Sequence, residues 1–186
     1  MSSLLKSRFL SAEQFADLSQ MSVPKELVSG CIVEQTMPSG LRHGYICSRI
    51  SFLLTAFLND NDIGRVMGND SFVVTRRDPD TVRGADLCFY SYARLPKGPI
   101  PEKFADKSPD LVYEVRSPYD RWIEVIAKTT EYLEAGVSVV CVVDPKDQTV
   151  SIYRADENPR ILTIEDAFVL PDILPGFTIP IRKFFE

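Results

Sequence analysis

The segment that most constrains the fold lies between Pro109 and Pro118 and reads PDLVYEVRSP. Because strand side chains alternate between faces, its apolar residues Leu111, Tyr113 and Val115 share one face. The other face carries Asp110, Val112, Glu114 and Arg116. In a central strand these carboxylates would be partly buried, which is costly unless they are paired or bind a metal. The alternative that this segment alone leaves open is an edge strand with a solvated polar face.

The following residues extend this strand into a larger unit. A helix is predicted over residues 119–135, with Gly136 at its C-terminal end. Residues 137–143 form a continuous apolar run, which is typical of a strand buried on both faces. This strand–helix–strand unit predicts a right-handed parallel crossover. Hairpins elsewhere would make the sheet mixed, so the predicted fold class is α/β.

The earlier half of the chain supplies helices and antiparallel strands. Ser11 and Gln14 have the spacing of a capping box and predict a helix start. Two short strands are expected around a turn at Ser29 and Gly30, and a long helix from His43 to about Leu58. Further strands are predicted at 71–75, 84–90 and 149–153, and the apolar tail is expected to pack back onto the body.

Composition excludes several classes of function. The 186 residues predict one domain, without an apolar run long enough for a membrane span and without a secretory signal. Four scattered cysteines without a Cys-x-x-Cys pair indicate reduced packing residues and a cytoplasmic protein. No glycine-rich phosphate loop follows a strand, so no nucleotide cofactor is expected. The net charge of −5 lowers the expected affinity for nucleic acid without excluding DNA.

Candidate chemistry centres on Asp86 and Glu114, two carboxylates in apolar runs predicted to be neighbouring strands. Together they could bind magnesium, which prefers oxygen ligands. A nearby cation could position water or stabilise the transition state, and the candidates are Lys107, Lys128 and Arg116. Lys128 falls off the Trp122–Ile126–Leu133 stripe of its helix, so periodicity does not place it in the site. His43, the single histidine, begins a helix, where capping or packing is the default role.

An ordered series of landmarks resembles the Uma family of restriction-endonuclease-like proteins, members of the PD-(D/E)XK nuclease superfamily. The landmarks are SAEQF at 11–15, ELVSG at 26–30, PSGLRH at 38–43, RGAD at 83–86, PDLVYEVRSP at 109–118, Lys128 with EYLEAG at 131–136, VVDP at 142–145 and LPGF at 174–177. The resemblance implies a mixed central sheet flanked by helices, as in restriction endonucleases. It also implies a Mg²⁺- or Mn²⁺-dependent endonuclease acting on DNA.

The resemblance assigns roles to individual positions. Asp86 and Glu114 match the two metal ligands, and Lys128 matches a catalytic lysine moved to the following helix. Arg116 stands where the superfamily lysine usually lies, two residues after Glu114. Asp110, Glu26 and His43 match recurrent family positions and are expected around the site. Ala85 replaces the proline of the PD element, which leaves the carboxylate of Asp86 in place.

The expected organisation is a single domain over 1–186. It has an N-terminal helix and hairpin at 1–36, a nuclease-like core at 37–153 and a C-terminal tail at 154–186 packed on the core. A homodimer is expected because cutting two strands needs two sites, with the apolar tail as a possible interface. Two alternatives stay open. One is an inactive nuclease fold used for DNA binding or assembly, and the other is a structural protein in which Arg83 and Arg116 neutralise Asp86 and Glu114.

Overall fold

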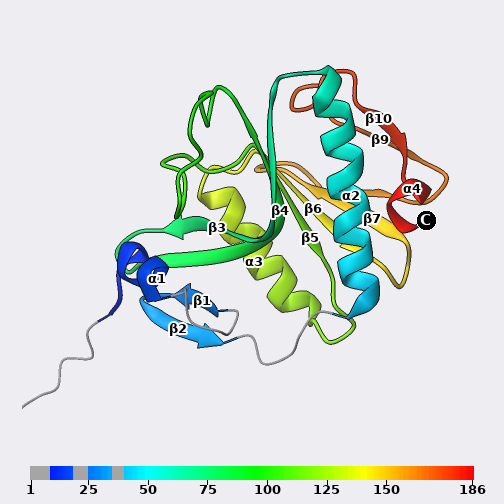
Figure 1. Ribbon diagram of the computed structural model, residues 1–186. Coiled ribbons are helices and arrows are strands. Elements are labelled where there is room, and N and C mark those ends of the chain that lie inside the picture. Colours follow the sequence, from blue (N-terminus) through cyan, green and yellow to red (C-terminus); the bar gives the residue numbers. More distant parts are fainter. Residues whose placement is uncertain (1–8, 19–24, 35–39) are drawn as a thin grey trace, which may run out of the picture.

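The computed structural model describes residues 9–18, 25–34 and 40–186 (Figure 1). Within these ranges the helices are α1 (Ala12–Leu18), α2 (Leu41–Asp60), α3 (Trp122–Glu134) and α4 (Arg182–Phe185). The strands are β1 (Lys25–Val28), β2 (Cys31–Glu34), β3 (Gly64–Arg76), β4 (Thr81–Ser91), β5 (Leu111–Val115), β6 (Val139–Asp144), β7 (Thr149–Tyr153), β8 (Arg160–Leu162), β9 (Ala167–Val169) and β10 (Thr178–Pro180). No helix in this part of the chain is long and apolar enough to cross a membrane.

The main sheet has the order β2-β1-β4-β5-β6-β7-β8, with β3 also paired to β4. Only the β5–β6 pair is parallel within the described residues, and α3 connects these two strands. The predicted mixed sheet and α/β class are therefore confirmed. β5 lies between β4 and β6, so the edge-strand alternative for this segment is wrong.

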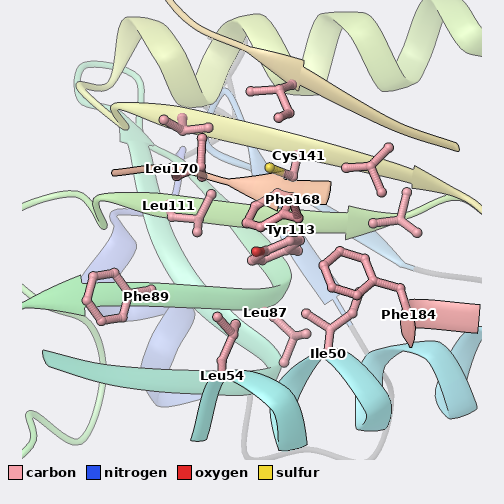
Figure 2. Packing of buried hydrophobic residues seen from close by; sticks show 14 of the residues in the cluster. Ile50, Leu54, Leu87, Phe89, Leu111, Tyr113, Cys141, Phe168, Leu170 and Phe184 are labelled. Atoms are coloured by element: carbon pink, nitrogen blue, oxygen red, sulfur yellow. The ribbon is translucent and has the colours of Figure 1, made fainter. Parts of the chain in front are cut away.

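The two faces of the sheet are covered by different elements (Figure 1). The predicted alternation along β5 holds, because Leu111, Tyr113 and Val115 belong to the core cluster that includes α2, whereas Val112 packs with Tyr132 of α3. Figure 2 shows the first cluster, where Ile50 and Leu54 of α2 lie below the side chains of β4 and β5. Glu114 alternates with Tyr113 and Val115, so its side chain lies on the α3 face of the sheet.

The C-terminal tail completes the α2 face of the sheet. Phe168 of β9 and Phe184 of α4 pack near Tyr113, with ring centroids 5.8 and 6.3 Å from its ring (Figure 2). Further tail residues in this cluster are Leu170, Leu174, Phe177 and Ile181. These side chains are buried within the chain itself, so the expectation that the apolar tail forms a dimer interface does not hold for them.

Two local predictions have different outcomes. The capping box is present: the Ser11 N–H donates to Oε1 of Gln14 (2.9 Å), and the Gln14 N–H donates to Oγ of Ser11 (3.2 Å). In contrast, β3 begins at Gly64 rather than Ser71. Its ladder with β4 is interrupted between Gly68 and Ser71, where Asn69 and Asp70 adopt positive φ angles of 61° and 55°. Asn69 and Asp70 thus form a β-bulge within one longer strand.

Candidate functional site

The candidate site lies where β4 and β5 separate. Their ladder ends at Leu87 and Tyr113, and β4 then pairs with β1 at Val82. Asp86 and Glu114 are the next residues of the two strands beyond this last pair. The N–H of Val115 donates to Oδ2 of Asp86 at 2.6 Å. The carboxylate thus satisfies a backbone donor that the departing strand leaves free.

Glu114 is the largely buried acid of this fork. Its Oε1 accepts a hydrogen bond from the Tyr132 hydroxyl (2.8 Å) and its Oε2 accepts one from Nζ of Lys128 (3.0 Å). Burial raises the pKa of Glu114 to about 7, and the nearby Asp86 carboxylate adds to this rise while Lys128 opposes it. A nearby positive charge therefore stabilises the ionised form of Glu114.

Lys128 links three parts of the site. Besides Glu114, its ammonium donates to the carbonyl of Gly84 (3.0 Å) and pairs with Oε1 of Glu26 (3.2 Å). Burial lowers its pKa, but Glu114, Glu26 and Asp86 outweigh this and raise the pKa above its usual value. Helical periodicity did not place Lys128 in the site, because the acidic partners that allow this charged face of α3 to be buried lie on β1 and β5.

Glu26 and Arg83 form a network behind the lysine. Arg83 pairs with Oε2 of Glu26 (2.7 Å) and makes two bonds to Glu131 of α3 (2.7 and 2.8 Å). The N–H of Gly84 donates to Oε1 of Glu26 (3.2 Å). Arg83 thus pairs with Glu26 and Glu131, and not with Asp86 as the structural alternative assumed.

His43, at the start of α2, contacts Asp86. Its Nε2 lies 3.2 Å from Oδ2 of Asp86, and its Nδ1 lies 3.7 Å from Sγ of Cys47. The hydrogen bond to Asp86 is the main cause that raises the pKa of His43 to about 10. The imidazolium thus holds the Asp86 carboxylate, a role beyond the capping or packing default. His43, Cys47 and Asp86 each offer one ligand atom, and these three atoms lie within 4.8 Å of one another. The three residues could therefore also hold a metal ion.

Sequence reasoning missed Cys47, Tyr132 and Asp70. Cys47 follows His43 by four residues, and Tyr132 follows Lys128 by four, so both were detectable as helical neighbours of candidate residues. Asp70 is an exposed residue on the bulge of β3. Desolvation of its carboxyl group and the charge of Asp86 raise its pKa. Asp70 lies near Asp86 because of the bulge in β3, and a bulge is not visible in the periodicity of a sequence.

Two expected neighbours lie elsewhere. Asp110 precedes β5, at the opposite end of the strand from Glu114, where it pairs with Arg94 (3.0 Å) and accepts a bond from the N–H of Ser91 (2.6 Å). Arg116 pairs with Asp144, and its guanidinium lies 4.5 Å from the centre of the Trp122 ring. Both have their own partners, so the structure does not join them to the Asp86–Glu114–Lys128 group.

Lys107, the remaining lysine candidate, is also outside the group. Its Nζ lies 3.3 Å from the carbonyl of Ala93, in the loop after β4. Of the three candidate cations, Lys128 is thus the one that contacts Glu114.

Comparisons with known proteins agree with this architecture. The fold matches the crystal structure of "a putative nuclease belonging to DUF820" from Anabaena variabilis, with a TM-score of 0.80 and 21% identity over 95% of this chain and 97% of that one. No curated protein matches the sequence. The model of the Uma2 family, described as "Putative restriction endonuclease", matches residues 12–182. The chain therefore belongs to the Uma2 family of restriction-endonuclease-like proteins.

Proposed function

We propose that this protein is a metal-dependent endonuclease that hydrolyses phosphodiester bonds in DNA. The observation that carries the proposal is the position of Lys128, whose ammonium donates to Glu114 directly beside the fork that holds Asp86. Two acids and a lysine at one point of a sheet are the groups that phosphoryl hydrolysis needs: ligands for a cation and a donor for developing negative charge.

The residues of the fork fit a magnesium or manganese ion. Their donor atoms are carboxylate oxygens, which these cations prefer. Within the described residues, Oδ1 of Asp86 accepts no hydrogen bond, and the raised pKa of Glu114 indicates a carboxylate short of positive charge. A bound divalent cation would supply Lewis acidity toward the phosphoryl oxygen and the attacking water.

The other side chains would act on orientation and charge. Lys128 stays protonated and can donate a hydrogen bond to the attacking water or to a phosphoryl oxygen. Tyr132 fixes the rotamer of Glu114 through its hydroxyl, and His43 fixes Asp86 through Nε2. Such partners behind the ligands hold a carboxylate in the orientation that binding requires.

Thermal unfolding with and without Mg²⁺ or Mn²⁺ tests the metal site. A ligand bound only by the native state raises the melting temperature by mass action. We expect a rise for the wild type that is lost in Asp86→Asn and Glu114→Gln. Asp172→Asn is the control, because Asp172 is an acid paired with Arg154 outside the site. Equal shifts in all four proteins would contradict the assignment of Asp86 and Glu114.

Cleavage of plasmid DNA tests the reaction. We expect Mg²⁺-dependent nicking that falls by about 10²–10³-fold in Lys128→Met, the usual cost of removing a donor to developing charge. A protein that binds metal and DNA but cleaves neither strand would instead support an inactive nuclease fold serving as a binding or assembly module.

The proposal includes a homodimer, because two strands require two active sites. Exposed apolar side chains that could form its interface lie on β2 and near the start of α3: Ile32, Val33, Tyr119, Trp122 and Ile123. Light scattering at working concentration checks this part, and a monomer that cuts both strands in one binding event would contradict it.

A further inference from the structure

We propose that a cavity beside the fork receives one nucleobase of the substrate strand. The cavity has a volume of about 280 Å³ and lies between β3, β4 and the loop that follows β4. This volume lies just under the range of about 300–1,000 Å³ that small-molecule sites usually span, so the cavity suits one small planar group rather than a larger ligand. The inference rests on the proposed function, since it names the part of the substrate that binds next to the catalytic groups.

Three aromatic side chains contribute to the wall. Phe72, Tyr90 and Phe104 line the cavity. Phe72 packs against Phe15 with ring centroids 5.4 Å apart, and the guanidinium of Arg77 lies 5.5 Å from the ring centre of Phe104. These contacts fix the two rings from outside the cavity. Fixed aromatic rings are the surfaces on which bases of a single strand stack, whatever their sequence.

One polar group in the wall is open to the cavity. Tyr90 is 5% exposed as a residue, but its hydroxyl oxygen is not among the fully enclosed unpaired atoms of the described residues, so it is reached from the cavity that Tyr90 lines. A hydroxyl in this position can form a hydrogen bond with a group bound in the cavity. Burial raises the pKa of Tyr90, so its hydroxyl stays protonated and can both donate and accept.

The cavity adjoins the catalytic fork. Asp70 lines it and is close enough to Asp86 and Lys128 for their charges to act on its pKa. Cys88 follows Asp86 by two residues on β4, so the cavity wall begins close to the fork along this strand. The wall residues Cys88 and Tyr90 also share a core cluster with Tyr132, whose hydroxyl holds Glu114. A base in the cavity would therefore belong to a nucleotide near the scissile phosphate.

This position has a consequence for the substrate. A base stacked and paired inside a duplex cannot enter a cavity until it leaves the stack, which costs free energy. We therefore expect the protein to prefer a strand with an unpaired base next to the cleavage site over a fully paired duplex.

Binding of a labelled single-stranded oligonucleotide in Ca²⁺, measured by fluorescence anisotropy, tests the cavity. Ala105 lines the cavity from the loop, so Ala105→Leu fills it without altering a strand. Ala93→Leu is the matched control, because Ala93 is an exposed residue of the same connection outside the cavity. We expect Kd to rise about tenfold in Ala105→Leu and to stay unchanged in Ala93→Leu. Tyr90→Phe, which removes only the hydroxyl, should raise Kd about threefold.

A cleavage assay in Mg²⁺ gives a second readout. A single abasic position is moved stepwise along the oligonucleotide, and one position near the cut should lower kcat/KM about tenfold for the wild type but not for Ala105→Leu. Equal binding by Ala105→Leu and Ala93→Leu, with no abasic effect, would overturn the cavity assignment while leaving the nuclease intact. Absence of any metal-dependent binding or cleavage of DNA would overturn the proposed function itself.

Discussion

Helices α2 and α3 cover opposite faces of the same sheet, and they bury different kinds of side chain. The buried residues of α2 are Ile46, Ile50 and Leu54, which are the apolar positions that helical periodicity predicts. The face of α3 turned toward the sheet carries Val125, Lys128, Thr129 and Tyr132, while three apolar residues, Trp122, Ile123 and Ile126, are exposed. The buried face of α2 is therefore apolar, whereas that of α3 is largely polar.

The difference between the buried faces of α2 and α3 shows which kind of packing the helical spacing of apolar residues can predict. α2 packs against apolar side chains, so the most hydrophobic face is the buried one. α3 packs over Glu114 and near Glu26. The side chain at the contact is therefore Lys128, whose charged end pairs with both acids and whose carbon chain can pack among apolar neighbours. Helical spacing of apolar residues reveals the first arrangement. It misses the second, because the acids that make burial of Lys128 favourable lie on other elements.

The largest effect is expected from removing the buried charge on α3. Lys128→Met should destabilise the protein by about 3–5 kcal/mol, because it leaves acids buried without their partner. Urea unfolding at pH 8, above the pKa of about 7 for Glu114, measures this loss.

The double variant Lys128→Met/Glu114→Gln is its control. It removes both charges together and should recover most of the stability while remaining inactive. If the free energy of unfolding of the single Lys128→Met variant lies within about 1 kcal/mol of the wild-type value, the packing of α3 does not depend on the ion pair.

Much of the fold was predictable because it depends on local patterns. The alternation along β5, the apolar run of β6, the capping box of α1 and the buried face of α2 are each encoded within a few consecutive residues. The short strands β8, β9 and β10 were not predicted. Each has only three residues, which is too short for a period-two pattern to stand out.

The candidate site was predictable only in part. Asp86 and Glu114 stood out as charges inside apolar strands, but the residues alone did not choose between Lys107, Lys128 and Arg116. That choice depends on the pairing of Arg116 with Asp144 and on the direction in which α3 packs, both of which are tertiary. The family resemblance indicated Lys128, whereas the periodicity of apolar residues did not place it in the site.

A somewhat smaller effect is expected on the other helix. Leu54→Ala in α2 removes a buried apolar side chain and should destabilise the protein by about 2–4 kcal/mol. The loss in Lys128→Met should change with pH as Glu114 titrates near its pKa of about 7, whereas the loss in Leu54→Ala should stay constant between about pH 6 and 9, because no charge is involved. Urea unfolding at about pH 6 and pH 9 separates the two cases, and a marked pH dependence for Leu54→Ala would contradict the contrast between the helices.

The ion pair next to the start of α3 should show its effect at acid pH. Burial acts to raise the pKa of Asp144, but hydrogen bonds from Arg116 and from the N–H groups of Lys146 and Asp147 outweigh it and hold the pKa below its usual value. A carboxyl group with a lowered pKa contributes stability above the unfolded-state pKa of about 3.9 and loses that contribution as pH falls through its folded-state pKa.

Asp144→Asn should therefore cost about 1–3 kcal/mol at pH 7, and this difference from the wild type should shrink as pH falls below about 4. Urea unfolding of both proteins between about pH 2.5 and 7 follows the difference. A gap that stays constant over this range would mean that the carboxylate charge of Asp144 does not contribute.

The smallest effect on stability is expected at an exposed apolar residue of α3. Ile123 is 74% exposed on α3, so Ile123→Ser removes little buried surface and should change stability by less than about 0.5 kcal/mol, apart from a minor loss of helix propensity. Ile50→Ser on α2 is the matched substitution at a fully buried position and should cost several times more. Thermal unfolding at dilute concentration compares the two variants directly. A large loss for Ile123→Ser that grows with protein concentration would indicate that this face of α3 is covered in a dimer, and the contrast between the helices would then hold only for the monomer.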